Sequence, residues 1–70
     1  MSAGAAIIVV GTRVRHRKRG STYVIRHFGT LQMEGPQDMA SMVIYQGEED
    51  GRVWVRPWSE FFDGRFEVLG

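Results

Sequence analysis

The chain has 70 residues, of which 43% are hydrophobic, with nine Lys or Arg, eight Asp or Glu, and no cysteine. This length allows one small domain with a modest core, and the apolar fraction excludes a disordered chain. Without cysteine there is no disulfide framework and no thiolate metal site. The first residues lack positive charge and the apolar run after them is too short to span a bilayer, so we expect a cytoplasmic protein.

The charges are unevenly distributed along the chain. Residues 1–35 hold six Arg or Lys and one Glu, whereas residues 36–70 hold three Arg and seven acids. One interpretation is that the two halves neutralise each other across a small fold, where each exposed pair contributes about 0–1 kcal/mol.

Alternating apolar and polar residues, interrupted by turn residues about every 8–12 positions, predict short strands. The apolar residues 7–10 continue through a bend at Gly11 into residues 12–17 as a first strand, and residues 18–21 form a turn. Residues 22–31 form a second strand with two faces. We take as the inner face Tyr23, Ile25, His27 and Leu31, and as the outer face Thr22, Val24, Arg26 and Phe28.

The second half continues the pattern. A Gly-Pro loop at residues 34–38 precedes a third strand at residues 41–46, and a hairpin loop at residues 47–51 contains Asp50-Gly51, with positive φ expected at the glycine. A fourth strand at residues 52–56 ends at Pro57. Ser59 is the predicted N-cap of one helical turn over residues 60–62, Gly64 closes that turn in the left-handed region, and residues 66–69 form a last strand.

Four or five short strands with a helical turn before the last one are typical of an SH3-like barrel. We therefore predict an all-β fold, a small SH3-like barrel of about five strands with one short helical turn before the last strand. The barrel forms a single domain over residues 1–70, with an apolar N-terminal extension at residues 1–11.

The segment with the most specific pattern reads V-I-Y at residues 43–45 and W-V-R-P-x-x-x-F at residues 54–61. It resembles the V-V-Y and W-V-R-P-x-x-x-F signature of an uncharacterised bacterial and phage-associated family of small domains. R-V-R-H at residues 13–16, Gly20, Y-x-I at residues 23–25 and F-D-G-R-F at residues 62–66 extend the resemblance over residues 12–67. Many members carry a longer stretch where this chain has H-F-G-T at residues 27–30. The family has no assigned activity, so the resemblance implies a fold and leaves the function open.

Nothing in the sequence indicates an enzyme. A nucleophile–base pair needs a hydroxyl near a histidine, and the histidines are His16 and His27. His27 shares the predicted inner face of its strand, where a packed imidazole is the simpler interpretation. The acids at residues 48–50 lack the ligand spacing of a cation site, and no nucleotide-binding or metalloprotease motif is present. We therefore assign no catalytic residue, metal or cofactor.

The leading interpretation is a non-enzymatic protein-interaction module. If Val53 and Val55 face the core, Trp54 faces outward between two arginines, and Trp and Arg are the residues most enriched at binding hot spots. The alternative is that the turn at residues 57–62 covers Trp54, which then serves packing only. Phe61 is expected in the core, and at least one aromatic residue of that turn is expected to be exposed. The candidate partner-binding residues are Tyr45, Arg52, Trp54, Arg56 and Trp58.

The alternative function is nucleic-acid binding through a basic segment. On a strand, alternate arginines share one face about 7 Å apart, near the spacing of successive phosphates, and small barrels also stack bases on exposed aromatic rings. The other interpretation is a charged edge strand that prevents aggregation. The candidate residues are Arg13, Arg15, Arg17, Lys18 and Arg19.

The apolar run A-A-I-I-V-V at residues 5–10 lies outside the family-like pattern. Left free it would be an exposed patch that forms strands readily, which monomeric domains avoid. We therefore expect it to pair as an added strand, with burial against a second copy favoured in so small a domain. This predicts a homodimer that depends on residues 5–10.

Overall fold

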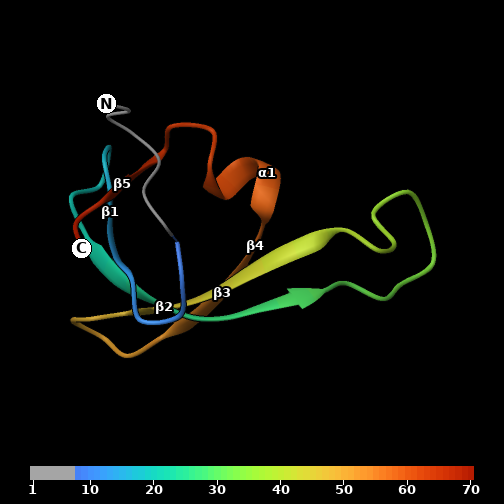
Figure 1. The fold of residues 1–70 in the computed structure, drawn as a ribbon, viewed down its shortest axis with the longest axis horizontal. Coiled ribbons are helices and arrows are strands. Elements are labelled where there is room, and N and C mark those ends of the chain that lie inside the picture. The colour runs from blue at the N-terminus through green and yellow to red at the C-terminus, as the bar shows by residue number, and fades with distance from the viewer. Residues whose placement is uncertain (1–7) are drawn as a thin grey trace.

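The computed structural model describes residues 8–70; residues 1–7 lie outside the described part. The described chain folds into five strands and one short helix, in the order β1 (Arg13–His16), β2 (Thr22–Thr30), β3 (Ser41–Gly47), β4 (Val53–Pro57), α1 (Trp58–Phe61) and β5 (Phe66–Val68). All strands pair antiparallel in one sheet with the order β4-β3-β2-β1-β5 (Figure 1). The sheet is not closed, so β4 and β5 are its edges. Within residues 8–70 no helix is long and apolar enough to cross a membrane.

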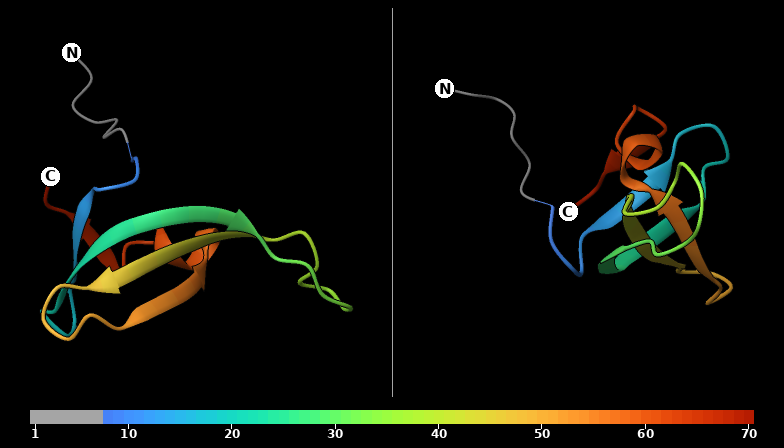
Figure 2. Two further views of the ribbon diagram at one scale, coloured as in Figure 1. Left: turned by 90° about the horizontal axis from the view of Figure 1, so that it is seen from below. Right: turned by 90° about the vertical axis from the view of Figure 1, so that its right-hand side faces the viewer.

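The sheet bends around its inner face, and α1 lies over that face between the two edges (Figure 2). The long β2–β3 hairpin carries its loop at residues 31–40 away from the rest of the fold (Figure 1). The predicted turn glycines Gly51 and Gly64 have φ of 72° and 104°, as expected for the hairpin loop and for the turn before β5.

The start of the chain differs from the predicted first strand. β1 covers only residues 13–16, and residues 8–10 are not a strand. The Thr12 amide donates to the Val9 carbonyl at 3.0 Å and the Thr12 hydroxyl accepts from the Val9 amide at 3.1 Å, so the chain turns at this point. Ile8 instead packs against the core. The predicted pairing of residues 5–7 lies outside the described residues.

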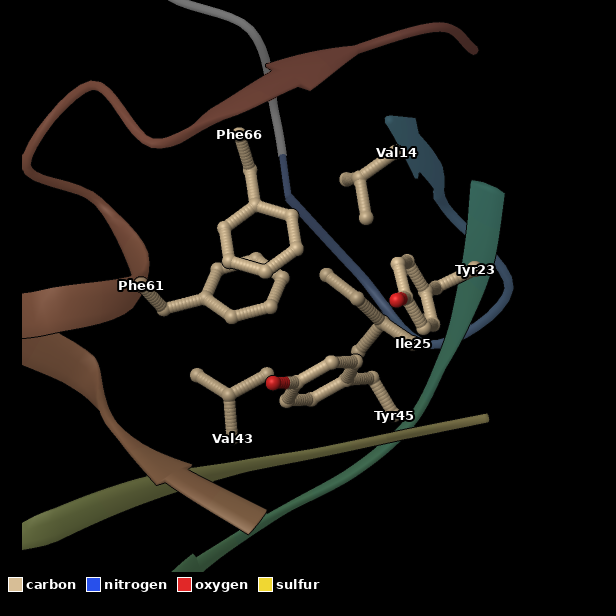
Figure 3. Close-up of a cluster of buried hydrophobic side chains, with 7 residues drawn as sticks. All are labelled: Val14, Tyr23, Ile25, Val43, Tyr45, Phe61 and Phe66. Carbon is tan, nitrogen blue, oxygen red and sulfur yellow. The ribbon is translucent and has the colours of Figure 1, made fainter. Parts of the chain in front are cut away.

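Aromatic rings dominate the core (Figure 3). Phe61 is fully buried, as predicted, and stacks on Phe66 with ring centroids 4.3 Å apart and an angle of 10° between the ring planes. Tyr45 meets both phenylalanines edge-on at 5.1 and 5.5 Å. Within residues 8–70 the buried hydrophobic residues are Val14, Tyr23, Ile25, Val43, Tyr45, Phe61 and Phe66.

The predicted inner position of His27 is wrong. The β2–β3 register shifts between Ile25 and His27, which leaves an extra residue at a β-bulge. Beyond the bulge His27 lies opposite Ile44 and Phe28 lies opposite the buried Val43, so the two faces of β2 are exchanged and His27 is exposed. A bulge adds one residue to a strand, and strict alternation does not anticipate it.

The condition under which Trp54 would face outward, with Val53 and Val55 in the core, is not met. Trp54 pairs with Tyr45 and Arg56 pairs with Val43, whose side chains belong to the core. Partners in an antiparallel pair share a face, so Trp54 and Arg56 lie on the inner side of β4. Val53 and Val55 therefore lie on the outer side, with 56% and 59% of their surface exposed.

The helical turn begins earlier than predicted. α1 covers Trp58–Phe61, and its N-cap is Pro57 rather than Ser59, without a side-chain capping bond. Proline suits this junction because it has no backbone N–H to continue the ladder of β4. Its φ of −58° is also near the value that its ring prefers. The turn buries Phe61 and leaves Trp58 and Phe62 with 41% and 38% exposure, which agrees with the expectation that it cannot bury all its aromatic rings.

Candidate functional site

Two adjoining hollows form one concave surface beside the β1–β2 turn. The larger is open, has a volume of about 780 Å³, and is lined by His16, Arg17, Lys18, Arg19, Arg56, Gly64 and Arg65. The smaller measures about 140 Å³ and is lined by His16, Arg19, Tyr23, Tyr45, Trp54, Arg56 and Phe66. Since His16, Arg19 and Arg56 line both, we treat the two as one site and call it the basic depression.

The β1–β2 turn holds the first group of cations in place. The His16 carbonyl accepts from the Gly20 amide at 2.7 Å, and its amide donates to the Ser21 carbonyl at 2.8 Å. The Arg19 amide donates to Nδ1 of the His16 ring at 3.2 Å. The turn closes through Gly20 at a φ of 78°, a conformation that costs a residue with Cβ. This turn therefore presents three consecutive cations from residues 17–19 at the depression.

Arg56 enters the depression from β4 and is anchored on the core. Its Nε donates to the Tyr45 hydroxyl at 3.2 Å, and its guanidinium lies 5.5 Å from the centre of the Phe66 ring. The hydrogen bond to Tyr45 is the main reason that the pKa of Arg56 is raised, and Glu60, 3.7 Å away, adds to it. Arg56 is therefore held as a cation at a defined position, on the floor of the site rather than free in solvent.

Arg65 enters from the segment just before β5, and carboxylates partly neutralise it. Its Nε lies 3.0 Å from Asp63 and one Nη lies 3.5 Å from Glu60. Among residues 8–70, by contrast, no ion pair is formed by the cations of the turn, Arg17, Lys18 and Arg19. The depression therefore carries an excess of positive charge, concentrated at the β1–β2 turn.

The surroundings of His16 lower the pKa of its ring. Its ring packs edge-on against Phe66 at 5.0 Å. Partial burial lowers the pKa of His16, and the positive charges of Arg19, Arg56, Arg65 and Lys18 lower it further. A histidine with a pKa below 6.5 is largely neutral at pH 7, so the cluster contains a neutral imidazole among cations.

The structure divides the five candidate nucleic-acid residues into two groups. Arg13 forms a two-point ion pair with Glu48, at 2.8 and 2.9 Å, and Arg15 lies 3.5 Å from Glu67. Neither lines the basic depression. Of the five candidates, the structure therefore brings Arg17, Lys18 and Arg19 together at the depression, while Arg13 and Arg15 lie exposed on β1 outside it.

The candidate partner-binding residues are divided as well. Tyr45 is buried, with its hydroxyl on Arg56. Trp54 lines the depression with 37% of its surface exposed, and the Arg52 guanidinium lies 5.3 Å from the centre of its ring. Neither α1 nor the core covers Trp54 completely, so it is available for contact.

Trp58 belongs to a different surface. Its ring lies 5.3 Å from Phe28 and 4.7 Å from Phe62, and all three residues are exposed. We call Phe28, Trp58 and Phe62 the aromatic cluster. The bulge in β2 creates it, because the exchange of faces brings Phe28 to the side of α1.

The candidate residues from the sequence did not include five residues that line the depression, namely His16, Tyr23, Gly64, Arg65 and Phe66. The Arg17 amide donates to the Arg65 carbonyl at 2.9 Å beside the β1–β5 ladder. This pairing brings together two segments that lie far apart in the sequence. The only signal for it was the turn glycine Gly64, which predicted a strand after it but not the partner of that strand.

In the acidic loop at residues 48–50, the first carboxylate already has a partner. Glu48 is engaged by Arg13, and hydrogen bonds from Arg13 and Thr22 lower its pKa to about 2. Within residues 8–70 no group of three His, Asp or Glu side chains is placed to hold a metal ion.

Comparisons with protein-family models, with curated proteins and with solved structures found no match to this chain. The resemblance to the small bacterial and phage-associated family therefore depends on the quoted motifs alone. The function has to be argued from the site.

Proposed function

We propose that this protein is a non-enzymatic protein-interaction module and that the basic depression binds an acidic segment of its partner. The observation that carries the proposal is the position of Trp54: an exposed indole shares one concave surface with Arg56 and with the cations of the β1–β2 turn. Hot spots in protein interfaces are rich in Trp and Arg, and complementary charge speeds the encounter of the partners.

The surroundings of this surface support the proposal. Arg56 is hydrogen-bonded to Tyr45, which belongs to the aromatic core, so this part of the surface is organised before a partner arrives, which lowers the entropic cost of binding. The aromatic cluster offers a second contact, since three adjacent exposed rings are unusual on a small monomer. The strand order and the helical turn before β5 are consistent with an SH3-like barrel, which we propose as the fold type.

One observation favours a second candidate function, the binding of single-stranded nucleic acid. Arg17, Lys18 and Arg19 have no carboxylate partner among residues 8–70, and Trp54 in the same depression is an exposed ring on which a base can stack. The pairing of Arg13 with Glu48 and of Arg15 with Glu67 shortens the charged track, which is why we rank this function second.

A binding titration separates the two functions. The probes are a fluorescent Glu-rich peptide that contains one Leu and one Phe, a single-stranded oligonucleotide of equal net charge, and a duplex of the same sequence. We expect the peptide to bind best and Trp54→Ala to weaken it about tenfold or more, as for a hot spot. Val55→Ala, at an exposed position on the outer side of the same strand, is the control for the depression. An oligonucleotide that binds more tightly than the peptide, with a steep dependence on salt, would establish the second function instead.

A further inference from the structure

Cations from three separate parts of the fold meet around His16. Lys18 and Arg19 come from the β1–β2 turn, Arg56 comes from β4, and Arg65 precedes β5. Each of the four is close enough to act on the His16 ring electrostatically. Such convergence is costly unless something compensates it, because like charges repel.

The protein's own carboxylates neutralise only part of this positive charge. The larger hollow is lined by five Lys or Arg side chains, and the carboxylates paired with them are Glu60 and Asp63. Both acids lie on the side of Arg65 and Arg56, and neither is paired with the turn. The uncompensated charge therefore lies around Arg19, which lines both hollows.

A carboxylate and a phosphoryl group make different demands on such a site. This protein shows what one carboxylate needs, because Glu48 pairs with one cation, the guanidinium of Arg13, at 2.8 and 2.9 Å, and Thr22 adds a neutral hydrogen bond. A phosphomonoester carries about −1.5 to −2 charges at pH 7 and three strong acceptor oxygens, so it takes two or more cations at once. A cluster of several cations around one point matches the second ligand better than the first.

We propose that the basic depression binds a phosphoryl group carried by a side chain of the partner protein. Arg19 and Arg56, which line both hollows, hold the phosphoryl oxygens, while Lys18 and Arg17 add charge from the turn. Trp54 in the smaller hollow contacts a residue that flanks the modified side chain. This inference rests on the proposed protein-interaction function and names the chemical group that this surface selects.

The compact shape of the cluster favours one phosphoryl group over a nucleic-acid strand. A strand presents a row of phosphates and needs a row of free cations to match it. Here the arginines that would extend the row along β1, Arg13 and Arg15, are paired with Glu48 and Glu67. Of the cations that line the basic depression, those without an ion pair among residues 8–70 are Arg17, Lys18 and Arg19, all at one end of β1.

His16 makes the site observable by NMR, and His27 is its internal control. His16 faces Arg19 and Lys18 from the turn, Arg56 from β4 and Arg65 from before β5, while Glu60 and Asp63 pair with these last two arginines. A bound dianion would favour the imidazolium form and raise the pKa of His16. His27 lies exposed on the outer face of β2, away from the depression.

The first experiment adds inorganic phosphate to the full chain at constant ionic strength, with chloride as the balancing salt. At a pH just above the pKa of His16, its ring proton signals should move toward the positions of the protonated ring while those of His27 stay. In Arg19→Gln the movement should fall about tenfold at equal phosphate, because one charge-assisted contact is lost. Arg26→Gln, which removes the same charge outside the depression, should leave it unchanged. Equal movement of both histidines, or none, would overturn the proposal.

The second experiment compares three peptides that differ at one residue, phosphoserine, serine or glutamate, and adds a 5′-phosphorylated single-stranded oligonucleotide. We expect the phosphopeptide to bind about tenfold more tightly than the glutamate peptide. Equal affinity for the two would overturn this inference and leave the protein-interaction function standing. If no acidic peptide binds, both are wrong, and tighter binding of the oligonucleotide would assign the phosphoryl site to nucleic acid instead.

Discussion

Arg13 donates hydrogen bonds through Nε and Nη2 to both carboxylate oxygens of Glu48, at 2.8 and 2.9 Å, and so ties β1 to the loop between β3 and β4. Arg15 and Glu67 make a second link between the basic first half of the chain and its acidic second half. The fold therefore neutralises part of the charge asymmetry, as one interpretation of the sequence expected. Among the cations it leaves without a carboxylate partner within residues 8–70 are the three of the β1–β2 turn, where the basic depression lies.

The first prediction concerns acid stability. Arg13 and Thr22 lower the pKa of Glu48 from 4.5 to about 2 in the folded state, so the contribution of this carboxylate is present above pH 4.5 and is lost as the pH falls toward 2. We expect Glu48→Gln to flatten the pH dependence of the free energy of unfolding in this window. Urea unfolding at pH 7, 4.5 and 2.5 measures it. Glu49→Gln, in the same loop, should behave as the parent, and an identical pH profile for Glu48→Gln would contradict the prediction.

The second prediction concerns the core. Phe61 is fully buried and stacked on Phe66, so Phe61→Ala should cost about 3–5 kcal/mol, enough to unfold much of so small a domain. Phe62→Ala is the control, because the neighbouring ring is 38% exposed and should cost far less. Thermal unfolding followed by circular dichroism compares the two. A Phe61→Ala variant that melts within a few degrees of the parent would show that this ring does not hold the core together.

The third prediction tests the orientation of β4. Val55 is 59% exposed, so Val55→Thr should change the free energy of unfolding by no more than about 0.5 kcal/mol. Val43 is fully buried on β3, and the same substitution there places a hydroxyl in the core at a cost of about 1–3 kcal/mol. Denaturant titration of the two isosteric variants measures both changes in the free energy of unfolding. A large loss of stability in Val55→Thr would show that this side chain lies in the core.

The order of the elements could be predicted from the sequence, because turn residues and periodicity are local signals. The burial of Phe61 was predicted from its match to the aromatic position of the family-like motif. The faces of two strands could not be predicted. Alternation shows that Trp54 and Arg56 share a side, but which side is inner depends on their pairing with Tyr45 and Val43. In β2 one extra residue at the bulge exchanges the faces, so His27 is exposed and Phe28 joins Trp58.

The candidate site could be predicted only in part, again because its geometry depends on contacts between distant segments of the chain. Arg17, Lys18, Arg19, Trp54 and Arg56 were identified by residue type, but as members of two separate surfaces. Their union depends on non-local contacts, above all the β1–β5 ladder, which brings Arg65 and Phe66 beside His16. A single sequence carries no signal for such pairing.

The fourth prediction concerns the salt dependence of any binding to single-stranded DNA. Replacing Arg17, Lys18 and Arg19 together by Gln should flatten the slope of log K against log salt by about 2 units, since each contact to a single strand contributes about 0.7. The matched control replaces Arg13, Arg15 and Arg26 by Gln and removes equal charge, but from residues that do not line the depression. Equal flattening in both triple variants would show that the phosphate contacts are not confined to the depression. Absence of binding at low salt would contradict the nucleic-acid alternative.

The last prediction is the homodimer. Residues 8–10 support an interface at this end of the chain, because Val9 and Val10 each expose more than half of their surface beside the apolar residues that precede them. Ile8 packs on the core of its own chain, so a chain that starts at Gly11 should also lose some stability. Light scattering should give a dimeric mass for the full chain and a monomeric mass for the shortened one, and Val9→Ser with Val10→Ser should weaken the dimer while leaving Ile8 in place. A monomeric full chain contradicts the prediction, and so does a shortened chain that still dimerises.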